Sequence, residues 1–329
     1  MCVKQMLLIV AIVVAGVSPC LAAGARAAGP QTGAIPVIFD TDIGGDIDDT
    51  WALTLLLKSP HLDVKLVTTS NGQAEYRAKI IAKLLTVAGR TDIPVGVGEG
   101  GRDGVGGQQP WVKDYKLSDY PGKLYQDGAG AVIDVINRSP RPVTVISVGP
   151  LQTMAEVLKR DPRIATKASF AGMFGSVRKG YDGKSKIDAE CNVVSNPPAA
   201  QKVLSAPWQH ICITPVDTCG LVNLSGQRFQ TLKLSDNPSV KAMLENYRIW
   251  ANKKSIDDLQ ASSTLFDPVA VYLANPGNKP LIQFETLPII VTNDGFTRID
   301  PKGKKMLVAT SWNDLDGFRD LLVKTLTGP

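Results

Sequence analysis

The sequence predicts an α/β fold: one domain with a mostly parallel central sheet flanked by helices, in a Rossmann-like arrangement. Short runs rich in Val, Ile and Thr alternate with helical patterns, which is typical of parallel strands joined by helices. The chain has 329 residues, enough for one large domain with a substantial core. Because no internal repeat, low-complexity tract or linker divides it, we expect a single domain.

The expected strands are short apolar runs bounded by turn residues. They cover residues 35–40, 63–70, 95–97, 142–148, 169–174 and 211–215. The expected helices lie between these runs, and the first two end at residues that stop helices, Ser59-Pro60 and Gly89. The helices cover residues 49–58, 75–88, 128–137, 152–160 and 199–204. The stretch 98–127 is Gly-rich and predicts a long irregular connection.

The N-terminal segment, residues 1–28, is typical of a secretory signal peptide, and we expect the mature domain to comprise residues 29–329. A basic residue precedes an apolar run at residues 6–17, and small residues with Ala-x-Ala patterns follow, ending at Ala23 or Ala27. The apolar run is too short for a comfortable membrane span. We therefore expect export to the periplasm or the medium, with no stable membrane span after cleavage.

The cysteines leave two questions open. Cys20 would be the modified residue of a lipoprotein, but Pro19 just before it fits that signal poorly. Beyond the leader lie Cys191, Cys212 and Cys219, and an exported protein could pair two of them. No CxxC motif occurs, so a thiolate zinc site has no support.

The charge balance excludes one class of partner. The formal net charge is +5, and no basic block or stripe of basic and aromatic residues appears. Nucleic-acid binding depends on such a positive surface. We therefore expect a small-molecule ligand and no nucleic acid.

The densest chemical signal is an acidic turn of ten residues that follows the first expected strand. It contains five carboxylates: Asp40, Asp42, Asp46, Asp48 and Asp49. Mutually repelling acids are costly to hold together unless a cation or polar ligand lies between them. In open parallel sheets, ligands bind beyond the carboxyl ends of the strands, which is where this turn is expected.

An EF-hand calcium loop is one interpretation of the turn. The acids alternate, and Gly45 stands at the sixth position, as that loop requires. The twelfth position, however, is Trp51 instead of a bidentate Glu, and a strand instead of a helix precedes the loop. The EF-hand interpretation therefore fails on both ligand and context.

A magnesium-dependent phosphatase with an aspartyl-phosphate intermediate is a second interpretation, because its nucleophile turn also begins with Asp-x-Asp after a strand. That motif requires Thr or Val at the position of Gly44. It also gives no role to the three later acids of the turn. The phosphatase is therefore kept only as an alternative.

A third interpretation accounts for all parts of the turn. Strand, Asp-x-Asp, a Gly-containing turn, Asp-Asp and an apolar helix resemble the calcium-dependent nucleoside hydrolases of the inosine-uridine preferring family, in a variant with two extra residues in the turn. Five further motifs resemble that family and follow in its order. They are an apolar strand with a Gly-Pro-Leu turn (145–151), a Pro-Arg connection (161–164), a strand ending near Met (170–175), Glu-Cys-Asn (190–192) and Phe-Asp-Pro (266–268). The resemblance runs from about residue 35 to residue 275.

The resemblance implies hydrolysis of the N-glycosidic bond of ribonucleosides, or of related N-ribosyl compounds, to ribose and free base by a calcium-bound water. The implied protein ligands of Ca²⁺ are Asp42, Asp49, Asp267 and the backbone carbonyl of Val148. Oxygen ligands suit this hard cation. Asp42 is also the implied general base. Hydrolysis of an N-ribosyl bond passes through an oxocarbenium-like sugar, which an acidic pocket stabilises.

The resemblance also implies a ribose-binding set. Asp48, Glu190 and Asn192 would hold the hydroxyl groups, with Asn71 and Met173 lining the sugar pocket. Tyr181 stands where the family often has an Asn beside the ribose. Because the turn carries an insertion, the sequence leaves open whether Asp46 or Asp48 contacts the ribose.

The chain departs from the family's pattern at Phe266. The best-known members carry a His there, which helps to protonate the leaving base, and Phe cannot donate a proton. Tyr247 and Trp250, at i and i+3 of an expected helix, could face the base instead. The sequence leaves open which base is preferred and what protonates it.

A binding protein is the rival from another functional class. An exported, non-catalytic receptor for nucleosides or ribose would keep the calcium and hydroxyl contacts and would tolerate Phe266. The family forms dimers or tetramers, so a homo-oligomer is possible, but nothing in the sequence pattern decides the oligomeric state.

Overall fold

The structure is a computed structural model that describes residues 33–101, 104–275 and 280–328, and its main compact unit runs from Ala34 to Pro329. The predicted signal peptide, residues 1–28, lies outside the described residues. None of the described helices is long and apolar enough to cross a membrane.

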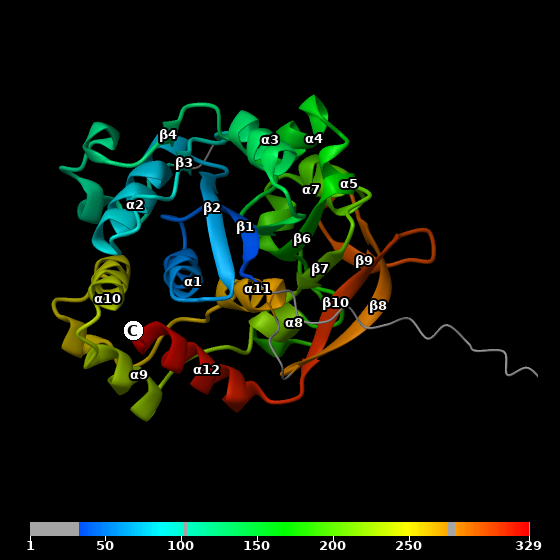
Figure 1. Cartoon of the computed structure of the whole chain (residues 1–329). Helices are drawn as coiled ribbons and strands as arrows, with labels where there is room; N and C mark the ends of the chain where they lie inside the picture. Colours follow the sequence, from blue (N-terminus) through cyan, green and yellow to red (C-terminus); the bar gives the residue numbers. More distant parts are fainter. Residues whose placement is uncertain (1–32, 102–103, 276–279, 329) are drawn as a thin grey trace, which may run out of the picture. The chain divides into compact units, whose positions relative to one another are not determined.

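The centre of the unit is one sheet, to which ten strands of the described chain belong (Figure 1). Its strand order is β4-β3-β2-β1-β5-β6-β7-β10-β8-β9. The strands are β1 (Ile35–Thr41), β2 (Leu62–Thr69), β3 (Val95–Gly96), β4 (Leu124–Tyr125), β5 (Val143–Ser147), β6 (Ala168–Met173), β7 (Ile211–Thr214), β8 (Ile282–Val291), β9 (Thr297–Ile299) and β10 (Lys304–Trp312). Neighbours from β4 to β10 pair in parallel, whereas β8 is antiparallel to both β10 and β9. The predicted mostly parallel α/β fold is confirmed.

The helices follow the alternation expected from the sequence. The α-helices are α1 (Asp48–Leu57), α2 (Ala74–Val87), α3 (Gly128–Arg138), α4 (Gln152–Arg160), α5 (Ile164–Lys167), α6 (Cys191–Val194), α7 (Pro197–Leu204), α8 (Val216–Cys219), α9 (Gly226–Lys233), α10 (Pro238–Trp250), α11 (Asp267–Ala274) and α12 (Leu315–Thr327). Four short 3-10 helices in the described chain are η1 (Gln109–Val112), η2 (Leu117–Asp119), η3 (Tyr181–Gly183) and η4 (Ile256–Asp258). The stretch expected to be wholly irregular, 98–127, thus contains η1, η2 and the two-residue strand β4.

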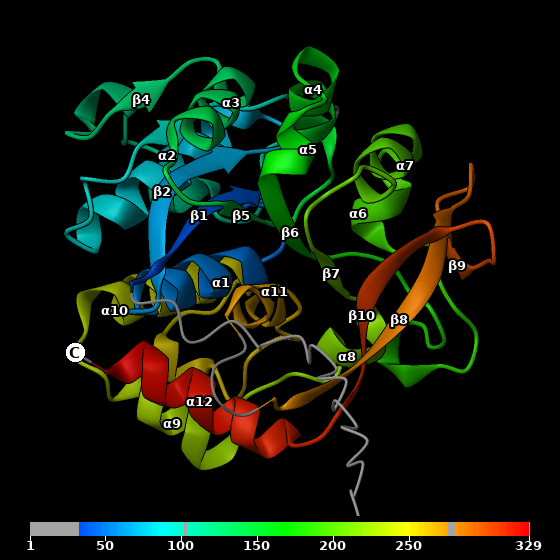
Figure 2. The same ribbon diagram turned by 45° about the vertical axis from the view of Figure 1, so that its right-hand side comes forward.

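Two hydrophobic cores cover the two faces of the sheet. Along β1, Val37 and Phe39 belong to one core and Ile38 to the other, because successive side chains of a strand point to opposite faces. The first core includes α1 and α10–α12, and the second includes α3, α4 and α7. Figure 2 shows these two groups on opposite sides of the strands. Both faces are covered, which explains why the sequences of β1 and β5 are rich in Val and Ile.

The strand order reverses next to β1, whose neighbours are β2 on one side and β5 on the other. A crevice for a ligand forms at such a reversal, beyond the carboxyl ends of the strands. Asp42 follows β1 there, Asn71 follows β2, and Val148 follows β5. Met173 is the last residue of the next strand, β6. The topology therefore brings distant parts of the sequence to one edge.

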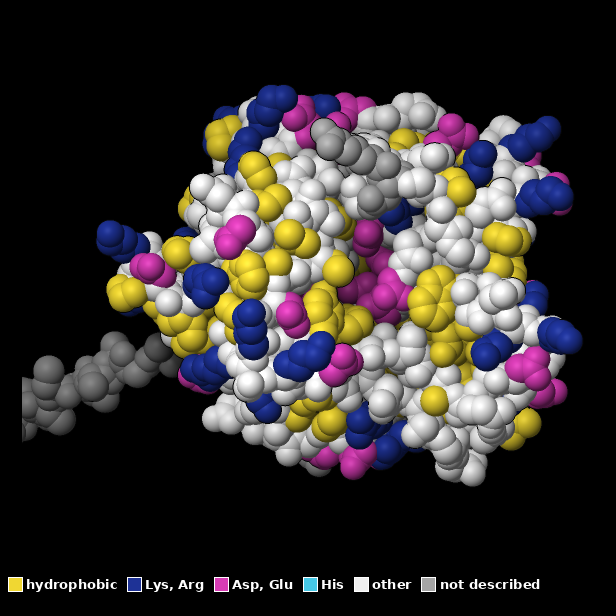
Figure 3. Space-filling view, turned by 180° about the vertical axis from the view of Figure 1, so that it is seen from behind, with side chains coloured by type: hydrophobic (Ala, Val, Ile, Leu, Met, Phe, Trp, Pro, Cys, Tyr) yellow, Lys and Arg dark blue, Asp and Glu magenta, His cyan; other side chains and the backbone are white. Residues whose placement is uncertain are grey.

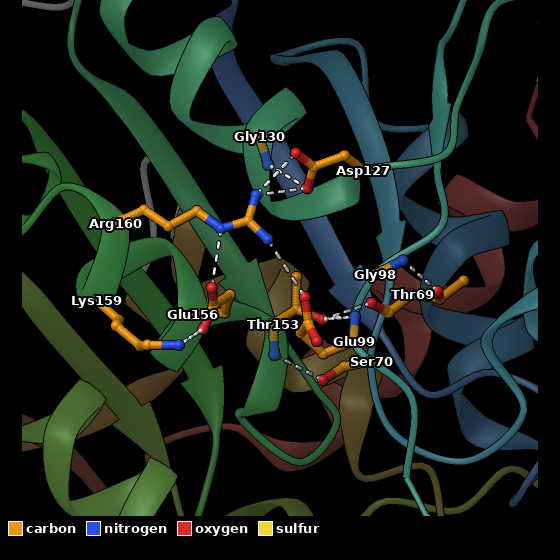
Figure 4. Close-up of polar contacts among 10 residues, drawn as sticks. All are labelled: Thr69, Ser70, Gly98, Glu99, Asp127, Gly130, Thr153, Glu156, Lys159 and Arg160. Carbon is orange, nitrogen blue, oxygen red and sulfur yellow. Dashed lines mark hydrogen bonds and ion pairs between the residues drawn. The ribbon is translucent and has the colours of Figure 1, made fainter.

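The Gly-rich segment after β3 lies against the same edge of the sheet. Gly98 N donates to Thr69 Oγ1 (2.9 Å), and Glu99 N donates to Thr153 Oγ1 (2.8 Å), which itself donates to the Thr69 carbonyl (2.8 Å) (Figure 4). A Cβ atom on Gly98 would lie 1.8 Å from the Thr69 carbonyl oxygen, so only glycine permits this approach. The segment is thus fixed to the carboxyl end of β2 and the start of α4.

An ion-pair cluster on α4 supports the start of this segment. Arg160 pairs with Glu156 (2.9 Å), with Asp127 at the start of α3 (2.7 Å) and with Glu99 (3.7 Å), as Figure 4 shows. These side chains are partly exposed, so the stabilisation from each pair is small. The cluster nevertheless links α3, α4 and the Gly-rich segment.

The possible disulfide is not formed in the described chain. Cys191 is exposed, Cys212 is half-buried and Cys219 is buried, and all three are free thiols. Burial raises the pKa of the Cys219 thiol well above its usual range, and burial alone raises that of Cys212 to about 12. Both thiols therefore stay protonated and unreactive at neutral pH.

Candidate functional site

A cavity of about 360 Å³ lies at the carboxyl edge of the parallel strands. Nine of the ten residues that the sequence predicts for the site line it: Asp42, Asp48, Asn71, Val148, Met173, Tyr181, Glu190, Asn192 and Asp267. The tenth, Asp49, lies behind the wall. Figure 3 shows acidic side chains gathered in a hollow, with hydrophobic side chains on both sides. The sequence analysis did not predict that Pro150, Cys191 and Ser195 would line the cavity.

A larger cavity of about 520 Å³ lies elsewhere, beside α1, α11 and α12. Its lining is mostly apolar, and its titratable residues are His61, Asp314 and Tyr272. His61 is next to the start of β2, at the opposite end of the strand from the acidic turn. We assign the functional site to the smaller cavity because acids and amides converge there.

The acidic turn places two carboxylates at the start of a helix. Asp48 and Asp49 form the first turn of α1 and are almost fully buried. Asp49 accepts a hydrogen bond from Thr41 Oγ1, and Asp48 Oδ2 accepts one from the backbone N–H of Asp267 (3.3 Å). Because the N-terminus of a helix carries partial positive charge, this position favours both acids.

Three of the buried acids form a compact oxygen cluster. Carboxylate oxygens of Asp48, Asp49 and Asp267 all lie within 4.8 Å of one another. Burial raises the pKa of each well above its usual range, and the charges of neighbouring carboxylates, including Asp42, raise it further. Buried oxygen ligands at this spacing suit a hard divalent cation. Asp48 thus joins Asp49 and Asp267 as a candidate ligand, and the metal roles of all four acids, Asp42 included, stay predictions.

Asp42 lines the cavity, and the positively charged side chain of Arg77 lies near its carboxylate. Arg77 on α2 is only 2% exposed, and its Nη2 lies 3.9 Å from Asp42 Oδ2. The same guanidinium donates to the carbonyls of Asn71 and Ile43, each at 3.0 Å. Arg77 thereby fastens the enlarged turn after β1 to the turn after β2. Sequence reasoning missed this residue, because an Arg on an amphipathic helix usually points to solvent.

The Glu-x-Asn motif, Glu190 and Asn192, forms another part of the cavity wall. Glu190 precedes α6 and accepts backbone N–H groups of Asn192 (2.7 Å), Gly175 (3.0 Å) and Val193 (3.3 Å). Burial raises the pKa of Glu190 to about 7, although these hydrogen bonds oppose the shift. Asn192 Nδ2 donates to the Val148 carbonyl (2.9 Å), which is a predicted calcium ligand. The motif thus also has a structural role in joining α6 to the end of β5.

Asn71 adopts a left-handed backbone conformation, with φ of 62°. Such conformations are uncommon outside glycine, although Asn tolerates them best. Gln152 Nε2 donates to Asn71 Oδ1 (3.1 Å), which fixes the amide at the cavity wall. The predicted place of Asn71 in the sugar pocket is therefore consistent with its geometry.

Two aromatic residues form the apolar part of the wall. The rings of Tyr181 and Phe266 meet edge to face, with centroids 5.9 Å apart. The Tyr181 hydroxyl accepts the backbone N–H of Cys191 (3.1 Å). Phe266 immediately precedes α11 and Asp267, so the aromatic wall adjoins the acid cluster.

The alternative proton donors, Tyr247 and Trp250, do not line the cavity. Tyr247 donates its hydroxyl proton to the Ala261 carbonyl (2.9 Å), and its ring packs edge to face on Trp51 (6.1 Å). The hypothesis that these rings face the base therefore gains no support from the structure. Tyr247 is buried in the helical layer, and the half-buried ring of Trp250 packs against it, with centroids 5.9 Å apart.

The structure separates the acids whose roles the insertion left open. Asp46 is exposed at the cavity, whereas Asp48 lies deep within it.

Asp40 is fully buried and does not line the cavity. Its carboxylate accepts a hydrogen bond from Ser147 Oγ (2.9 Å), and burial raises its pKa well above the usual range. A phosphatase nucleophile would have to occupy that first position and face the substrate. Asp40 braces the strand end and cannot serve in this way.

The fold is that of nucleoside hydrolases of known structure. A plant nucleoside hydrolase superimposes with a TM-score of 0.71 at 23% identity, covering 90% of this chain and 99% of that one. A purine-preferring ribonucleoside hydrolase from Gardnerella vaginalis gives 0.71 at 18% identity, covering 89% and 98%. These similarities define the fold class.

The chain belongs to the inosine-uridine preferring nucleoside hydrolase family, whose model matches residues 37–318. The family predicted from the sequence motifs is thereby confirmed. The pyrimidine-specific ribonucleoside hydrolase RihA of Salmonella newport is 31% identical over 191 residues, which span 53% of this chain and 58% of that protein. An uncharacterized protein of Schizosaccharomyces pombe is 28% identical over 281 residues, or 76% of this chain and 84% of that protein.

We predict that the calcium-free protein loses thermal stability as pH rises from about 4.5 to about 7. In this range the folded protein keeps a proton on Glu190 that the unfolded chain releases, so raising the pH favours unfolding. Melting temperatures measured in EDTA across this range should fall by several degrees, and excess Ca²⁺ should reduce the fall because a cation favours the ionised acids.

Glu190→Gln is the matched variant for this measurement. It removes the titrating group and should give a shallower pH dependence in EDTA. A melting temperature that is constant or rises with pH in EDTA would contradict the burial argument.

Proposed function

We propose that the protein hydrolyses the N-glycosidic bond of ribonucleosides or related N-ribosyl compounds, releasing ribose and the free base. The proposal rests on one observation. The acids of the turn after β1, Asp42 and Asp48, line the same cavity as Glu190 and Asn192. The first group suits a cation and a developing positive charge, and the second suits sugar hydroxyls. Family membership supports the same reaction.

We further propose that Ca²⁺ is the cofactor. Asp42, Asp49, Asp267 and the Val148 carbonyl would hold it, with Asp48 beside them. The compact cluster of buried carboxylates in the described chain supports a cation at this place, and an all-oxygen ligand set favours calcium over zinc. When bound, the ion would acidify water and orient the ribose hydroxyls.

Residues of the chain would supply the general base and the contacts to the ribose. Asp42 accepts the proton of the attacking water, which its position at the cavity and its partial exposure of 20% permit. Asp48, Glu190 and Asn192 accept and donate hydrogen bonds to the ribose hydroxyls. The surrounding carboxylates stabilise the positive charge that develops on the sugar.

A receptor that binds nucleosides without cleaving them is the second candidate, and Phe266 is the observation that favours it. Where the resemblance implies a proton-donating His, this chain places the apolar ring of Phe266 at the cavity. A receptor would bind ligand in the presence of Ca²⁺ and release no sugar. Sugar release therefore separates the two candidates.

The test of the enzyme is release of reducing sugar from a panel of nucleosides by the purified mature chain, with and without Ca²⁺. We expect release that needs calcium. Asp42→Asn should lower kcat by about 100-fold or more, since it removes the general base with little change in shape. Its melting temperature should stay near that of the unmodified protein.

Asp236→Asn is the matched control, because the Asp236 side chain is 98% exposed and lies far along the sequence from the acidic turn. It should leave kcat unchanged. Binding without sugar release would support the receptor, and normal turnover by Asp42→Asn would exclude Asp42 as the base.

We also propose that residues 1–28 direct export and are removed. The basic start, apolar run and Ala-x-Ala patterns of the sequence support this. The mass of the protein recovered from the periplasm or medium should correspond to a chain that begins after Ala23 or Ala27. A full-length chain retained in the cytoplasm would contradict the proposal.

A further inference from the structure

We propose that Arg77 is a positioning residue, which holds the Asp42 carboxylate in the direction that a general base requires. The inference rests on the proposed function and adds to it a residue that does not line the cavity. Three features carry it. They are the burial of the guanidinium, the carbonyls that α2 binds, and two glycines that pack against Arg77 and Asp42.

The guanidinium of Arg77 is buried although it is permanently charged. The residue is 2% exposed, and a buried charge is costly unless its N–H groups find acceptors. Nε donates to the Asn71 carbonyl and Nη1 to the Ile43 carbonyl, each at 3.0 Å. Nη2 lies 3.9 Å from Asp42 Oδ2. Because the group is planar and rigid, the two carbonyl bonds fix where this third nitrogen lies.

The first turn of α2 holds the backbone of the acidic turn right beside Asp42. Ile43, whose carbonyl Arg77 binds, is the next residue after Asp42 in the chain. Tyr76, the neighbour of Arg77 on α2, donates its hydroxyl proton to the Gly44 carbonyl (3.1 Å). Two successive carbonyls of the acidic turn are thus fixed from the same helix, so the backbone that carries Asp42 has a defined course.

Gly72 leaves the space that the guanidinium occupies. Its φ is 56°, a left-handed conformation that glycine adopts readily. A Cβ atom at this position would lie 2.7 Å from Arg77 Nη2, which is closer than real Cβ contacts come. A side chain at residue 72 would therefore push against the same nitrogen that lies near Asp42.

Gly149, which follows β5, packs against Asp42 itself. A Cβ atom on Gly149 would lie 2.7 Å from the backbone nitrogen of Asp42 and 2.8 Å from its Cβ and its Oδ1. The other oxygen, Oδ2, is the one near Arg77. The two oxygens of the carboxylate thus have different neighbours, and both neighbours limit its rotation.

The direction of this carboxylate matters because a general base must lie within hydrogen-bond reach of the proton that it takes. A displacement of about 1 Å in a reacting group can cost about 100-fold in rate. Lysine has the charge of arginine but only one nitrogen, on a flexible chain, so it cannot bind both carbonyls and also lie near Asp42. A site that needed only the charge of Arg77 would tolerate lysine, whereas a positioning role would not.

The charge of Arg77 also predicts the sign of an effect on calcium. A cation beside Asp42, a predicted ligand, repels the ion, because charges at short range interact strongly where little water separates them. Removing the charge should therefore tighten calcium binding. A residue that served only to hold the fold together would have the reverse effect, since a loosened acidic turn would separate the ligands.

The test measures kcat, KM and calcium affinity of Arg77→Lys and Arg77→Gln in the mature protein, with the nucleoside that the unmodified chain cleaves fastest. Arg77→Lys should lower kcat by about tenfold or more because it misplaces the base, with KM changed by less than about threefold. It keeps the charge, so its calcium affinity should stay near that of the unmodified protein. Arg77→Gln should lower kcat at least as far and tighten calcium binding by about threefold or more in calorimetric titration.

Arg319→Gln is the matched control. The Arg319 guanidinium also donates to two carbonyls, those of Leu221 (3.0 Å) and Asn223 (3.1 Å), but it belongs to α12, which contributes no residue to the cavity. This variant should lower the melting temperature and leave kcat and calcium affinity unchanged. It reports the cost of losing carbonyl bonds where no base is involved.

The outcomes separate this inference from the function on which it rests. Near-normal kcat in Arg77→Lys, or weaker calcium binding in Arg77→Gln, would overturn the positioning role and leave the hydrolase intact. If both Arg77 variants fail to fold while Arg319→Gln folds, the role of Arg77 is structural and the inference is wrong. If the unmodified protein releases sugar from no nucleoside, the hydrolase and this inference fail together.

Discussion

Repulsion between buried carboxylates at the end of β1 is the constraint on which the rest of the site depends. Asp48, Asp49 and Asp267 are almost fully buried, and their oxygens lie within 4.8 Å of one another. The fold opposes the repulsion with the N-termini of α1 and α11, which begin at these residues. Helix dipoles offset only part of the cost of burying like charges, and the proposed cation would offset more of it.

The surrounding architecture holds this unfavourable cluster in place. Arg77 fastens the turn after β1 to the turn after β2, and the Gly-rich segment closes against both. A Cβ atom on Gly106 would lie 1.7 Å from the Gly44 carbonyl oxygen, so that segment packs directly on the acidic turn. The same negative field would favour both the proposed cation and a positively charged sugar in the transition state. Structure and proposed chemistry thus have one electrostatic origin.

Much of this could be predicted from the sequence, because the signals are local. Apolar strands followed by acids predict both the parallel sheet and its functional edge, and the spacing of Glu190 and Asn192 carries the family pattern. The rest depends on tertiary packing. Arg77 resembles an exposed helix residue, and Tyr247 is indistinguishable from a ligand contact until its hydroxyl is seen to bond Ala261. Strands β8, β9 and β10 were not predicted because they follow no βα alternation, and Leu307 in β10 is exposed.

Direct titration of the metal-free protein with Ca²⁺ tests the central claim most directly. Isothermal calorimetry should show one calcium ion bound per chain. Asp267→Asn should weaken binding by about tenfold or more because it removes one of the clustered carboxylates, whereas the exposed Asp236→Asn should not. If the folded protein binds no calcium, or if Asp267→Asn binds it as tightly as the unmodified chain, the buried acids do not form a cation site and the account is wrong.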